Sequence, residues 1–322
     1  MKIIITGVAG FIGFHLAKSL LKQGFSVFGI DNLNDYYSPK LKQDRLEILR
    51  EASNKFTFYK ADFSDAKIIT EIFQRHQDAN HLIHLGAQAG VRYSLENPIA
   101  YANSNLLGQV VIFDNAIKYL KNIPKIIYAS SSSVYGNQQK TPFSVTDDVS
   151  KPVSLYAATK KSCELIAESF SHTHNLHSVG LRFFTVYGEY GRPDMAYWSF
   201  SQNILEGKPI KLFNNGNLER DFTYINDIIS GLVGVIHIEN NPENKHRIYN
   251  LGNNKPVALK YFVEILEKNL GKKAVIEFAP MQKGDVYKTY ADIKESQKDF
   301  NYNPKTSIEE GLEKFVKWFR NQ

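Results

Sequence analysis

Cys163 is the only cysteine among the 322 residues, so no disulfide can form within the chain. A single thiol suits a reducing compartment, and we expect a cytoplasmic protein. Nowhere does the sequence approach the roughly 20 consecutive apolar residues that a membrane-spanning helix needs, so we expect no membrane partner. The apolar segment Ile3–Ile5 is too short for the core of a signal peptide, and it leads into glycines instead of a cleavage site.

The charge carries no sign of a nucleic-acid partner. Lysine and arginine number 39 against 33 acidic residues, a formal net charge of +6. These basic residues are spread along the chain without a dense run or an RNA-binding signature, so we expect no nucleic acid to bind. A modest positive bias is compatible with a small anionic substrate. The length suffices for one large domain or two closely packed ones.

Short β-branched runs alternate with longer helical patterns through the first half of the chain. Strands are predicted at Lys2–Thr6, Ser26–Ile30, Phe56–Ala61, His81–Leu85, Lys125–Ala129 and Ser178–Arg182. Helical patterns include Phe11–Gln23, Pro98–Tyr119 and Leu155–Thr173. This alternation predicts an α/β fold with a doubly wound parallel sheet of the Rossmann type.

The alternation becomes irregular after Phe183. We therefore expect a dinucleotide-binding domain over residues 1–183, to which a later segment near 219–251 returns. A smaller, partly interleaved α/β substrate domain is expected over residues 184–322. An amphipathic helix is predicted again near the end, at Ser307–Trp318.

A glycine-rich turn directly follows the first predicted strand. Gly7, Gly10 and Gly13 are spaced as GxxGxxG, and a helical pattern begins at once. In this context the first glycine permits a tight turn, the second lets the backbone approach a pyrophosphate, and the third lets helix and strand pack closely. The helix N-terminus adds unpaired N–H groups and the positive end of a dipole. The spacing is typical of the short-chain dehydrogenase branch of this fold and predicts a dinucleotide site.

Asp31 ends the second predicted strand, where a carboxylate accepts hydrogen bonds from the adenine-ribose hydroxyls and repels a 2′-phosphate. We therefore expect NAD, rather than NADP, as the cofactor. Asp62 and Phe63 follow the third strand, where they would meet the adenine; a helix cap by Asp62 near Ser64 explains that residue equally well. Residues 86–90, Gly-Ala-Gln-Ala-Gly, are small enough for the cofactor's backbone to pass over them.

Tyr156 and Lys160 lie four residues apart on one face of a predicted helix. A free tyrosine is a poor base at neutral pH, but a neighbouring ammonium and a positive nicotinamide ring favour its phenolate. Such pairs also arise by chance in many helices. The serine run 130–133 makes this one more specific, because it ends the fifth strand and ligands in such sheets bind at the carboxyl ends of the strands.

Longer segments of the sequence indicate more closely which family the chain resembles. They are Asp31–Tyr37, Ala87–Ser94, Leu155–Lys161, Leu181–Gly188, Gly191–Met195 and the segment 284–292. With these segments the chain resembles extended short-chain dehydrogenases of the nucleotide-sugar epimerase group over essentially its full length, and within that group the bacterial UDP-glucuronate 4-epimerases. The glycine triplet and the Tyr–Lys pair define only the superfamily.

The resemblance implies that Tyr156 is the general base and acid, that Lys160 activates it and binds the ribose, and that Ser131 is the hydroxyl partner. Further cofactor contacts are expected from Phe11, Ile12, Asn32, Leu85, Ala87, Gln88 and Asn105. Substrate contacts are expected from Arg92, Ser132, Ser133, Thr185, Arg192, Arg220 and Asp285. Arg220 would hold the diphosphate, with a salt bridge to Asp221 or Glu219 as the alternative. No metal is expected.

The implied reaction inverts C4 of UDP-glucuronate through a transient 4-keto sugar. At the positions of Ser132 and Ser133, the resemblance implies Asp and Glu in related 4,6-dehydratases. Because this chain has serines there, dehydration is not expected. A UDP-glucose or UDP-N-acetylglucosamine 4-epimerase and a UDP-glucuronate decarboxylase remain as alternatives. A non-catalytic NAD-binding regulator is a further alternative, against which the intact Tyr156, Lys160 and Ser131 speak.

The chain departs from the family pattern in two places. Glu189-Tyr190 stand where a Pro-Trp-like pair is expected, which weakens the assignment of Arg192, and Gly86 stands where alanine is usual. The resemblance also implies a homodimer in which the helices over 98–119 and 155–173 pair with their symmetry mates as a four-helix bundle. Amphipathic helices of that length agree with this arrangement.

Overall fold

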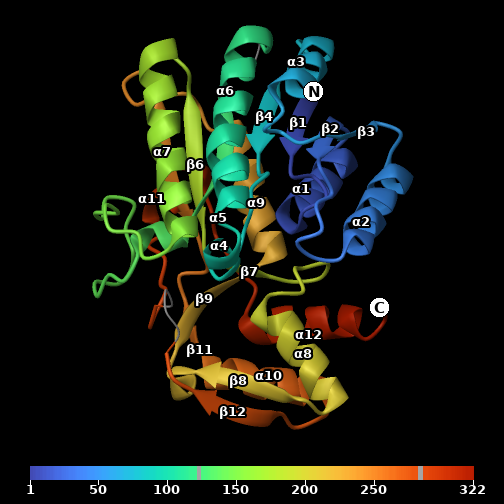
Figure 1. Cartoon of the computed structure of the whole chain (residues 1–322), viewed down its shortest axis with the longest axis vertical. Coiled ribbons are helices and arrows are strands. Elements are labelled where there is room, and N and C mark those ends of the chain that lie inside the picture. Colours follow the sequence, from blue (N-terminus) through green and yellow to red (C-terminus); the bar gives the residue numbers. More distant parts are fainter. Residues whose placement is uncertain (122–124, 282–285) are drawn as a thin grey trace.

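The computed structural model describes residues 1–121, 125–281 and 286–322. Its centre is a seven-stranded sheet in which every neighbouring pair is parallel, with the order β10-β6-β5-β4-β1-β2-β3 (Figure 1). The strands are β1 (Lys2–Thr6), β2 (Ser26–Asp31), β3 (Phe56–Lys60), β4 (His81–His84), β5 (Ile126–Ser131), β6 (Ser178–Phe183) and β10 (His246–Leu251). The predicted doubly wound sheet is confirmed, and the direction of winding reverses between β1 and β4.

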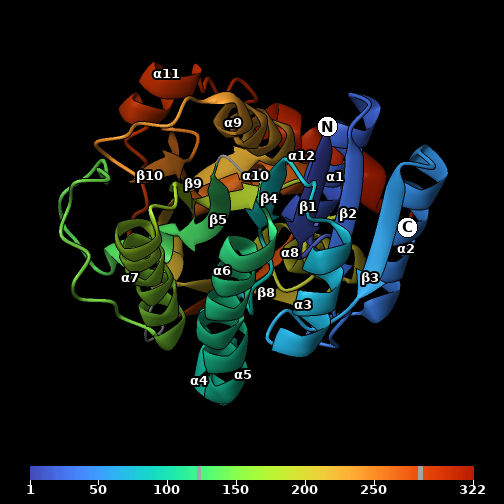
Figure 2. The same ribbon diagram turned by 90° about the horizontal axis from the view of Figure 1, so that it is seen from above.

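Helices cover both faces of this sheet (Figure 2). One face carries α3 (Ala66–Arg75), α6 (Gly108–Tyr119) and α7 (Leu155–His174). The other face carries α1 (Phe11–Lys22), α2 (Pro39–Ala52), α9 (Ile225–His237) and α11 (Lys294–Phe300). Because successive strand side chains point to opposite faces, Ile3 and Ile5 of β1 join the core beneath α1, whereas Ile4 joins the core beneath α6.

The predicted helix over 98–119 forms with an irregularity. It consists of α5 (Pro98–Tyr101), a π-helical stretch η1 (Ala102–Leu107) and α6, and the short α4 (Tyr93–Glu96) precedes it. The predicted helix over 155–173 is α7, capped by the hydroxyl of Ser154, which accepts a hydrogen bond from the N–H of Ala157 at 3.1 Å. Asn175 ends α7 in the left-handed conformation.

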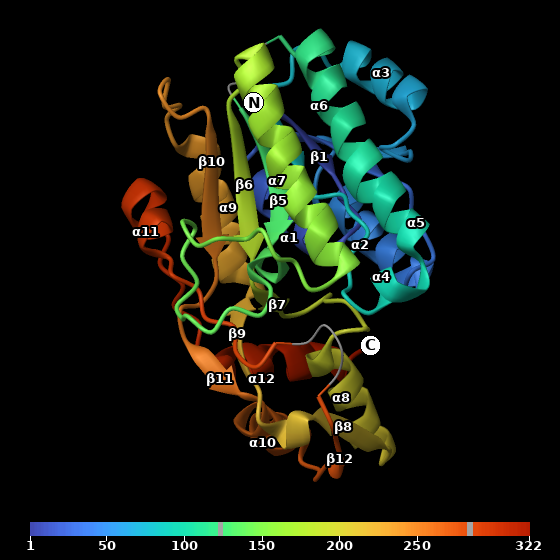
Figure 3. The same ribbon diagram turned by 60° about the vertical axis from the view of Figure 1, so that its left-hand side comes forward.

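A smaller part of the molecule lies against the carboxyl ends of the main strands (Figures 1 and 3). Its strands are β7 (Thr185–Tyr187), β8 (Pro209–Phe213), β9 (Glu219–Tyr224), β11 (Pro256–Ala258) and β12 (Val275–Ala279). They form a three-stranded sheet, β11-β9-β7, and a two-stranded sheet, β12-β8. The helices of the smaller part are α8 (Ala196–Glu206), α10 (Leu259–Leu270) and α12 (Ile308–Phe319), and a 3₁₀ turn, η3 (Asn214–Gly216), lies between β8 and β9. Another 3₁₀ turn, η2 (Ser132–Tyr135), directly follows β5 of the main sheet.

The two parts share one apolar core. The buried residues under α1 and α9 form a single cluster with Phe222, Phe262 and Phe315 of the smaller part. After β9 the chain also returns to the main sheet, where β10 pairs in parallel with β6. The smaller part is therefore held firmly against the sheet. Within the described ranges, no helix is long and apolar enough to cross a membrane.

Candidate active site

A cavity of about 780 Å³ opens between the carboxyl ends of the main strands and the smaller part. The glycine turn, the ends of β2, β4 and β5, the start of α7 and residues of β7, β8 and β9 all contribute to its wall. Its place at the point where the sheet winding reverses is where ligands bind in open α/β sheets, and its size is toward the upper end of ordinary ligand sites.

The glycine turn brings the backbone into contacts that no side chain would permit. Gly7 has a φ of +70°, and a Cβ there would lie 2.7 Å from the backbone nitrogen of Gly86. A Cβ on Gly13 would lie 2.1 Å from the carbonyl oxygen of Gly7. Gly10 caps α1 without any side-chain hydrogen bond to the first N–H groups of that helix. The turn therefore presents bare N–H groups and a dipole end to the cavity, as a pyrophosphate requires.

Asp31 ends β2 beside this turn and lines the same cavity. Its carboxylate accepts hydrogen bonds from the N–H of Ala9 at 3.2 Å and of Leu33 at 2.9 Å. Burial raises the pKa of Asp31, while Lys42 and the two N–H groups act in the opposite direction. A buried carboxylate at this place suits the ribose hydroxyls of NAD, so the residues present fit that cofactor.

The loop 86–90 is fixed from below by buried polar groups. Asn105, on the π-helical stretch, accepts a hydrogen bond from the N–H of Gln88 at 2.8 Å and donates one to its carbonyl at 3.1 Å. The hydroxyl of Thr6 accepts from the N–H of Gly86 at 3.1 Å and lies within hydrogen-bond distance of Nδ1 of His84, at 2.6 Å. Burial lowers the pKa of His84 to about 3, which leaves a neutral ring at this contact.

Tyr156 and Lys160 lie in the first turns of α7 and both line the cavity. The Nζ of Lys160 donates a hydrogen bond to the carbonyl oxygen of Ala129, in β5, at 3.0 Å. Tyr156 is half-buried, whereas Lys160 is almost fully buried. The phenol and the ammonium therefore face a common space at the end of β5.

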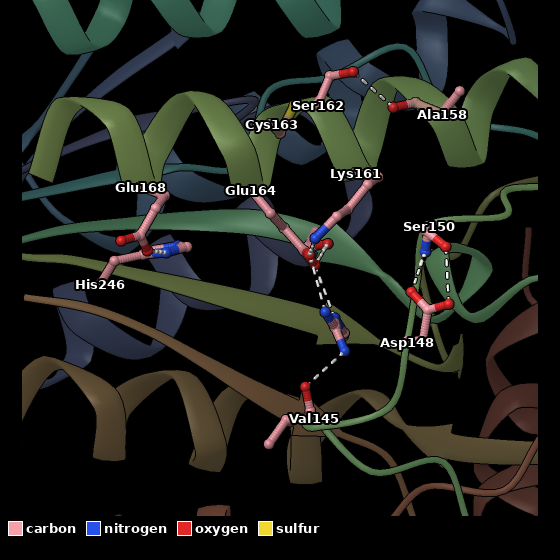
Figure 4. Close-up of polar contacts among 12 residues, drawn as sticks. Val145, Asp148, Ser150, Ala158, Lys161, Ser162, Cys163, Glu164, Glu168 and His246 are labelled. Atoms are coloured by element: carbon pink, nitrogen blue, oxygen red, sulfur yellow. Dashed lines mark hydrogen bonds and ion pairs between the residues drawn. The ribbon is translucent and has the colours of Figure 1, made fainter. Parts of the chain in front are cut away.

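A buried network holds the end of β5 against α7. Figure 4 shows Glu164 on α7 with Lys161 beside it. The carboxylate of Glu164 accepts two hydrogen bonds from Arg182 of β6, at 2.8 and 2.9 Å, and one from the hydroxyl of Ser130 at 2.7 Å. Burial alone would raise the pKa of Glu164, but these hydrogen bonds hold it below its ordinary value. Ser130 is thus tied to α7 directly before Ser131.

The serine run turns into the cavity after this anchor. The hydroxyl of Ser131 accepts a hydrogen bond from the N–H of Ser133 at 3.2 Å, which caps the 3₁₀ turn η2. Ser131, Ser132 and Ser133 all line the cavity, and Thr185 of β7 lines it too. These four hydroxyls form a polar wall on the same cavity as Tyr156.

Cationic side chains reach the cavity at two other places. Arg192 lies in the loop before α8, where it forms an ion pair with Asp194. The guanidinium of Arg192 also lies over the ring of Tyr36, which comes from the loop after β2. Arg220 lies in β9 of the smaller part, and the guanidinium of Arg92 stands 5.0 Å from the ring centre of Phe213 in β8. Arg220 donates to the carbonyl oxygens of Glu219 and Tyr287, at 3.0 and 3.2 Å. Three guanidinium groups therefore line the cavity, where they can meet an anionic ligand.

The structure brings together nearly all the residues expected from the sequence. The cavity wall includes Gly7, Gly10, Phe11, Ile12, Gly13, Asp31, Asn32, Phe63, Leu85, Ala87, Gln88, Arg92, Ser131, Ser132, Ser133, Tyr156, Lys160, Thr185, Arg192 and Arg220. Asp62 lies behind the wall, where it accepts hydrogen bonds from Asn32 and Ser64, and the helix cap is Asp65 instead. Asn105 also lies behind the wall, and Asp285 lies outside the described residues. The role of each remains a prediction.

Several wall residues were not expected from the sequence. Tyr36, Tyr93 and Asp194 fall inside segments that carry the family resemblance, so a signal for them existed. Lys211 and Phe213 come from β8, in the irregular part of the sequence, where no motif marks them. The cavity therefore has a wall supplied by the smaller part that periodicity alone does not reveal.

The fold and this site agree with the comparisons with known proteins. The chain belongs to the GDP-mannose 4,6 dehydratase family, whose model matches residues 4–315. An uncharacterized protein of Methanocaldococcus jannaschii is 53% identical over 319 residues, which cover 98% of this chain and 95% of that protein. UDP-glucuronate 4-epimerase 1 of Arabidopsis thaliana is 44% identical over 332 residues, which cover 99% of this chain and 76% of that protein.

A solved structure is also similar over the whole length. It is the UDP-glucuronic acid 4-epimerase of Bacillus cereus in complex with UDP-glucuronic acid and NAD, with a TM-score of 0.92 and 32% identity. The match covers 100% of this chain and 99% of that chain. The similarity therefore includes the main sheet and the smaller part together.

Proposed function

We propose that this chain is an NAD-dependent enzyme that inverts C4 of UDP-glucuronate to give UDP-galacturonate through a transient 4-keto sugar. The observation that carries the proposal is the meeting of three groups on one cavity: the NAD-type turn with Asp31, the pair Tyr156 and Lys160, and the hydroxyl wall that ends at Thr185. Relatives and a solved structure of UDP-glucuronate 4-epimerases support the choice of substrate.

The proposed chemistry begins at the 4-hydroxyl of the sugar. Tyr156 removes its proton, and the ammonium of Lys160 stabilises the phenolate that does so. Ser131 donates a hydrogen bond to the same oxygen and holds it in line. NAD, when bound, accepts the hydride of C4 and later returns it. Tyr156 gives the proton back to the sugar oxygen as the C4 ketone is reduced, so the enzyme ends each cycle in its starting state.

Inversion requires the keto sugar to present its other face before the hydride returns. The proposed anchor for this turn is the diphosphate, held by Arg92 and Arg220; Lys211 lines the same cavity. Arginine suits such an anchor because its fork of N–H donors matches phosphate oxygens. The sugar is then free to rotate about its link to a fixed diphosphate.

The carboxylate at C5 imposes a further demand. Once C4 is a ketone, the sugar is a β-keto acid, and it loses CO2 readily when the bond to the carboxyl carbon aligns with the carbonyl π-system. Ser132, Ser133, Thr185 and Arg192 are the groups to which we assign the restraint of this carboxylate. Hydrogen bonds to an ionised acceptor are the strong ones, so several together can hold one rotamer.

One observation and one experiment bear on the rival reactions. The family name describes a dehydration. This chain has Ser132 and Ser133 where the resemblance implies Asp and Glu in related dehydratases. It therefore lacks the acid and base for removing water. The test of the substrate is to incubate the NAD-loaded protein separately with UDP-glucuronate, UDP-glucose and UDP-N-acetylglucosamine, and to follow each sugar by NMR. We expect conversion of UDP-glucuronate to be the fastest. Preference for an uncharged UDP-hexose would contradict the carboxylate pocket, and pentose products would favour a decarboxylase.

We further propose a cytoplasmic homodimer built on α4, α5, α6 and α7. These helices lie side by side on one face of the molecule (Figures 1 and 3). These helices and the stretch η1 carry exposed apolar side chains: Leu95 is 66%, Ile99 67%, Leu107 49% and Leu165 58% exposed. A second copy would cover them. A stable monomer in light scattering at micromolar concentration would contradict the dimer.

We also propose that the chain is divided into two domains. Residues 1–183 would bind the dinucleotide, with a segment near 219–251 returning to this domain, and most of 184–322 would bind the UDP-sugar. The parallel pairing of β10 with β6 supports the return of the chain.

A further inference from the structure

Tyr36, Arg192 and Asp194 form a cluster of polar side chains at the cavity wall. Asp194 accepts a hydrogen bond from Nε of Arg192 at 3.0 Å on one carboxylate oxygen and from its Nη2 at 2.5 Å on the other. The second oxygen also accepts from the hydroxyl of Tyr36 at 3.1 Å. Because Tyr36 follows β2 and the other two precede α8, the cluster links the main sheet to the smaller part.

Both sides of this link are held in place by their surroundings. The ring of Tyr36 packs against Tyr93 with 4.7 Å between centroids, and its hydroxyl lies where a Cβ on Gly90 would approach to 2.4 Å. On the other side, Arg45 donates to the carbonyl oxygens of Tyr190 at 2.7 Å and Gly191 at 3.0 Å. The geometry of the cluster is thus set by the fold rather than by the three side chains alone.

The charges in the cluster are balanced. Burial works against the charge of Arg192, but Asp194 more than offsets it and keeps the pKa of the guanidinium above its ordinary value. For Asp194, burial is outweighed in the same way by Arg192, so the pKa of the carboxyl is lowered. Burial and then Asp194 raise the pKa of Tyr36 to about 12, which keeps this phenol a hydrogen-bond donor at neutral pH.

This pairing leaves one edge of the guanidinium for a ligand. Asp194 occupies Nε and Nη2, whereas Nη1 makes no hydrogen bond with any residue in 1–121, 125–281 or 286–322. A planar guanidinium held along one edge has a fixed direction for its remaining N–H groups. A carboxylate that meets Nη1 would therefore be held in one orientation, which is what suppression of CO2 loss requires.

We infer that Tyr36 and Asp194 are positioning residues, which aim Arg192 at the sugar carboxylate and thereby set the preference for a hexuronic acid. The inference rests on the proposed function. Neither residue needs to touch the substrate for this role. An uncharged UDP-hexose has no group for Nη1, so the inference assigns the two residues an effect on the acid and almost none on the neutral sugar.

The test uses the smallest change that breaks the link. Tyr36→Phe removes one hydroxyl and keeps the ring packed on Tyr93. Asp194→Asn keeps the shape and removes the charge. Tyr59→Phe is the matched control, since it also removes a phenol hydroxyl that bonds one side chain, His76 at 2.8 Å, but lies in β3 away from the cavity wall. Thermal unfolding of each variant checks that it is folded.

Binding is measured first, by calorimetry on NAD-loaded protein in a Tyr156→Phe background that turns over slowly. We expect Tyr36→Phe and Asp194→Asn each to weaken UDP-glucuronate about tenfold, the size of one charge-assisted hydrogen bond, and UDP-glucose less than about twofold. Tyr59→Phe should change neither ligand. Equal weakening of both ligands, or no change in either, would overturn the inference, because a merely structural role does not distinguish them.

Turnover gives a second readout that stability does not move. With Tyr156 intact, Tyr36→Phe should release more CO2 per UDP-glucuronate consumed than the wild type. In that side reaction the bond from C5 to the carboxyl carbon breaks, its electron pair passes to the 4-keto group as an enolate, and CO2 leaves. An unchanged CO2 fraction would count against the aim of Arg192.

The binding experiment distinguishes failure of the proposed function from failure of this inference. If the Tyr156→Phe parent does not prefer UDP-glucuronate to UDP-glucose, the proposed carboxylate pocket fails and the inference fails with it. If the parent shows that preference and Tyr36→Phe retains it in full, only the inference is overturned.

Discussion

Lys160 donates a hydrogen bond to the carbonyl oxygen of Ala129 at 3.0 Å, which ties the start of α7 to β5 two residues before Ser131. One side chain thereby fixes both elements that carry the proposed reacting groups. Lys160 is almost fully buried, and it lines the same cavity as Tyr156. The arrangement makes separate roles for Tyr156 and Lys160 testable.

Tyr156→Phe should lower turnover by at least about 100-fold, which is the cost of losing general acid–base catalysis. NAD binding should remain within about twofold of the wild type, because the ring and the position of Lys160 are retained. Turnover is followed by NMR and NAD binding by calorimetry. Near-normal turnover in this variant would remove Tyr156 from its proposed role.

Asp31 should decide the choice of dinucleotide. The wild type is expected to bind NAD+ at least about tenfold more tightly than NADP+, because the buried carboxylate accepts from the ribose and repels a 2′-phosphate. Asp31→Asn should narrow this ratio, since it keeps an acceptor for the N–H of Ala9 but removes the charge. Calorimetry with both dinucleotides measures the ratio. Equal affinities in the wild type would refute the assignment of Asp31.

Ser130 offers a way to test the anchor beneath Ser131. Ser130→Ala removes the hydrogen bond to Glu164, and we expect turnover to fall about tenfold with little change in NAD affinity. Ser171→Ala is the matched control, because it also removes a buried hydroxyl pair between α7 and β6, with Ser178 at 2.8 Å. Both variants should lose about 1 kcal/mol of unfolding free energy. Equal turnover in the two would show that the anchor serves stability alone.

Thr185 should affect the handling of UDP-glucuronate and the retention of its carboxylate. Thr185→Ala is expected to weaken handling of UDP-glucuronate about tenfold, while UDP-glucose changes little, because the lost hydrogen bond involves an ionised acceptor. The variant should also begin to release CO2, which labelled substrate detects. Loss of activity toward both sugars by the same factor would place Thr185 outside the carboxylate site.

The parallel sheet was predictable because its strands are β-branched runs separated by amphipathic helices and opened by the glycine turn. The predicted strand at residues 178–182, for example, became β6 with one residue more. The π-helical stretch at Ala102–Leu107 was not predictable, because its residues follow an ordinary helical pattern. The return of a segment near 219–251 to the first domain was expected, but its pairing as β10 with β6 was not, since strand order beyond neighbouring units depends on tertiary packing.

The site was predictable where motif and strand end coincide, as at Tyr156 and Ser131. The hydrogen bond of Tyr36 to Asp194 was not predictable, because it joins loops 158 residues apart in sequence. Tyr190 illustrates the same limit: it takes a φ of +54°, a backbone conformation that its residue type does not favour, and packs on Trp318 with 4.8 Å between ring centroids. Such features come from the packing of the smaller part on the sheet.

The central claim is that the hydrogen of C4 leaves the sugar and returns to the opposite face of the same carbon. NMR of UDP-glucuronate incubated in D2O with the NAD-loaded wild type tests it most directly. We expect UDP-galacturonate that retains its original hydrogen at both C4 and C5, with no net change in NADH and no CO2. Deuterium at C4 or a pentose product would contradict the proposed reaction, whereas deuterium at C5 alone would show only that the 4-keto sugar exchanges its C5 proton with solvent.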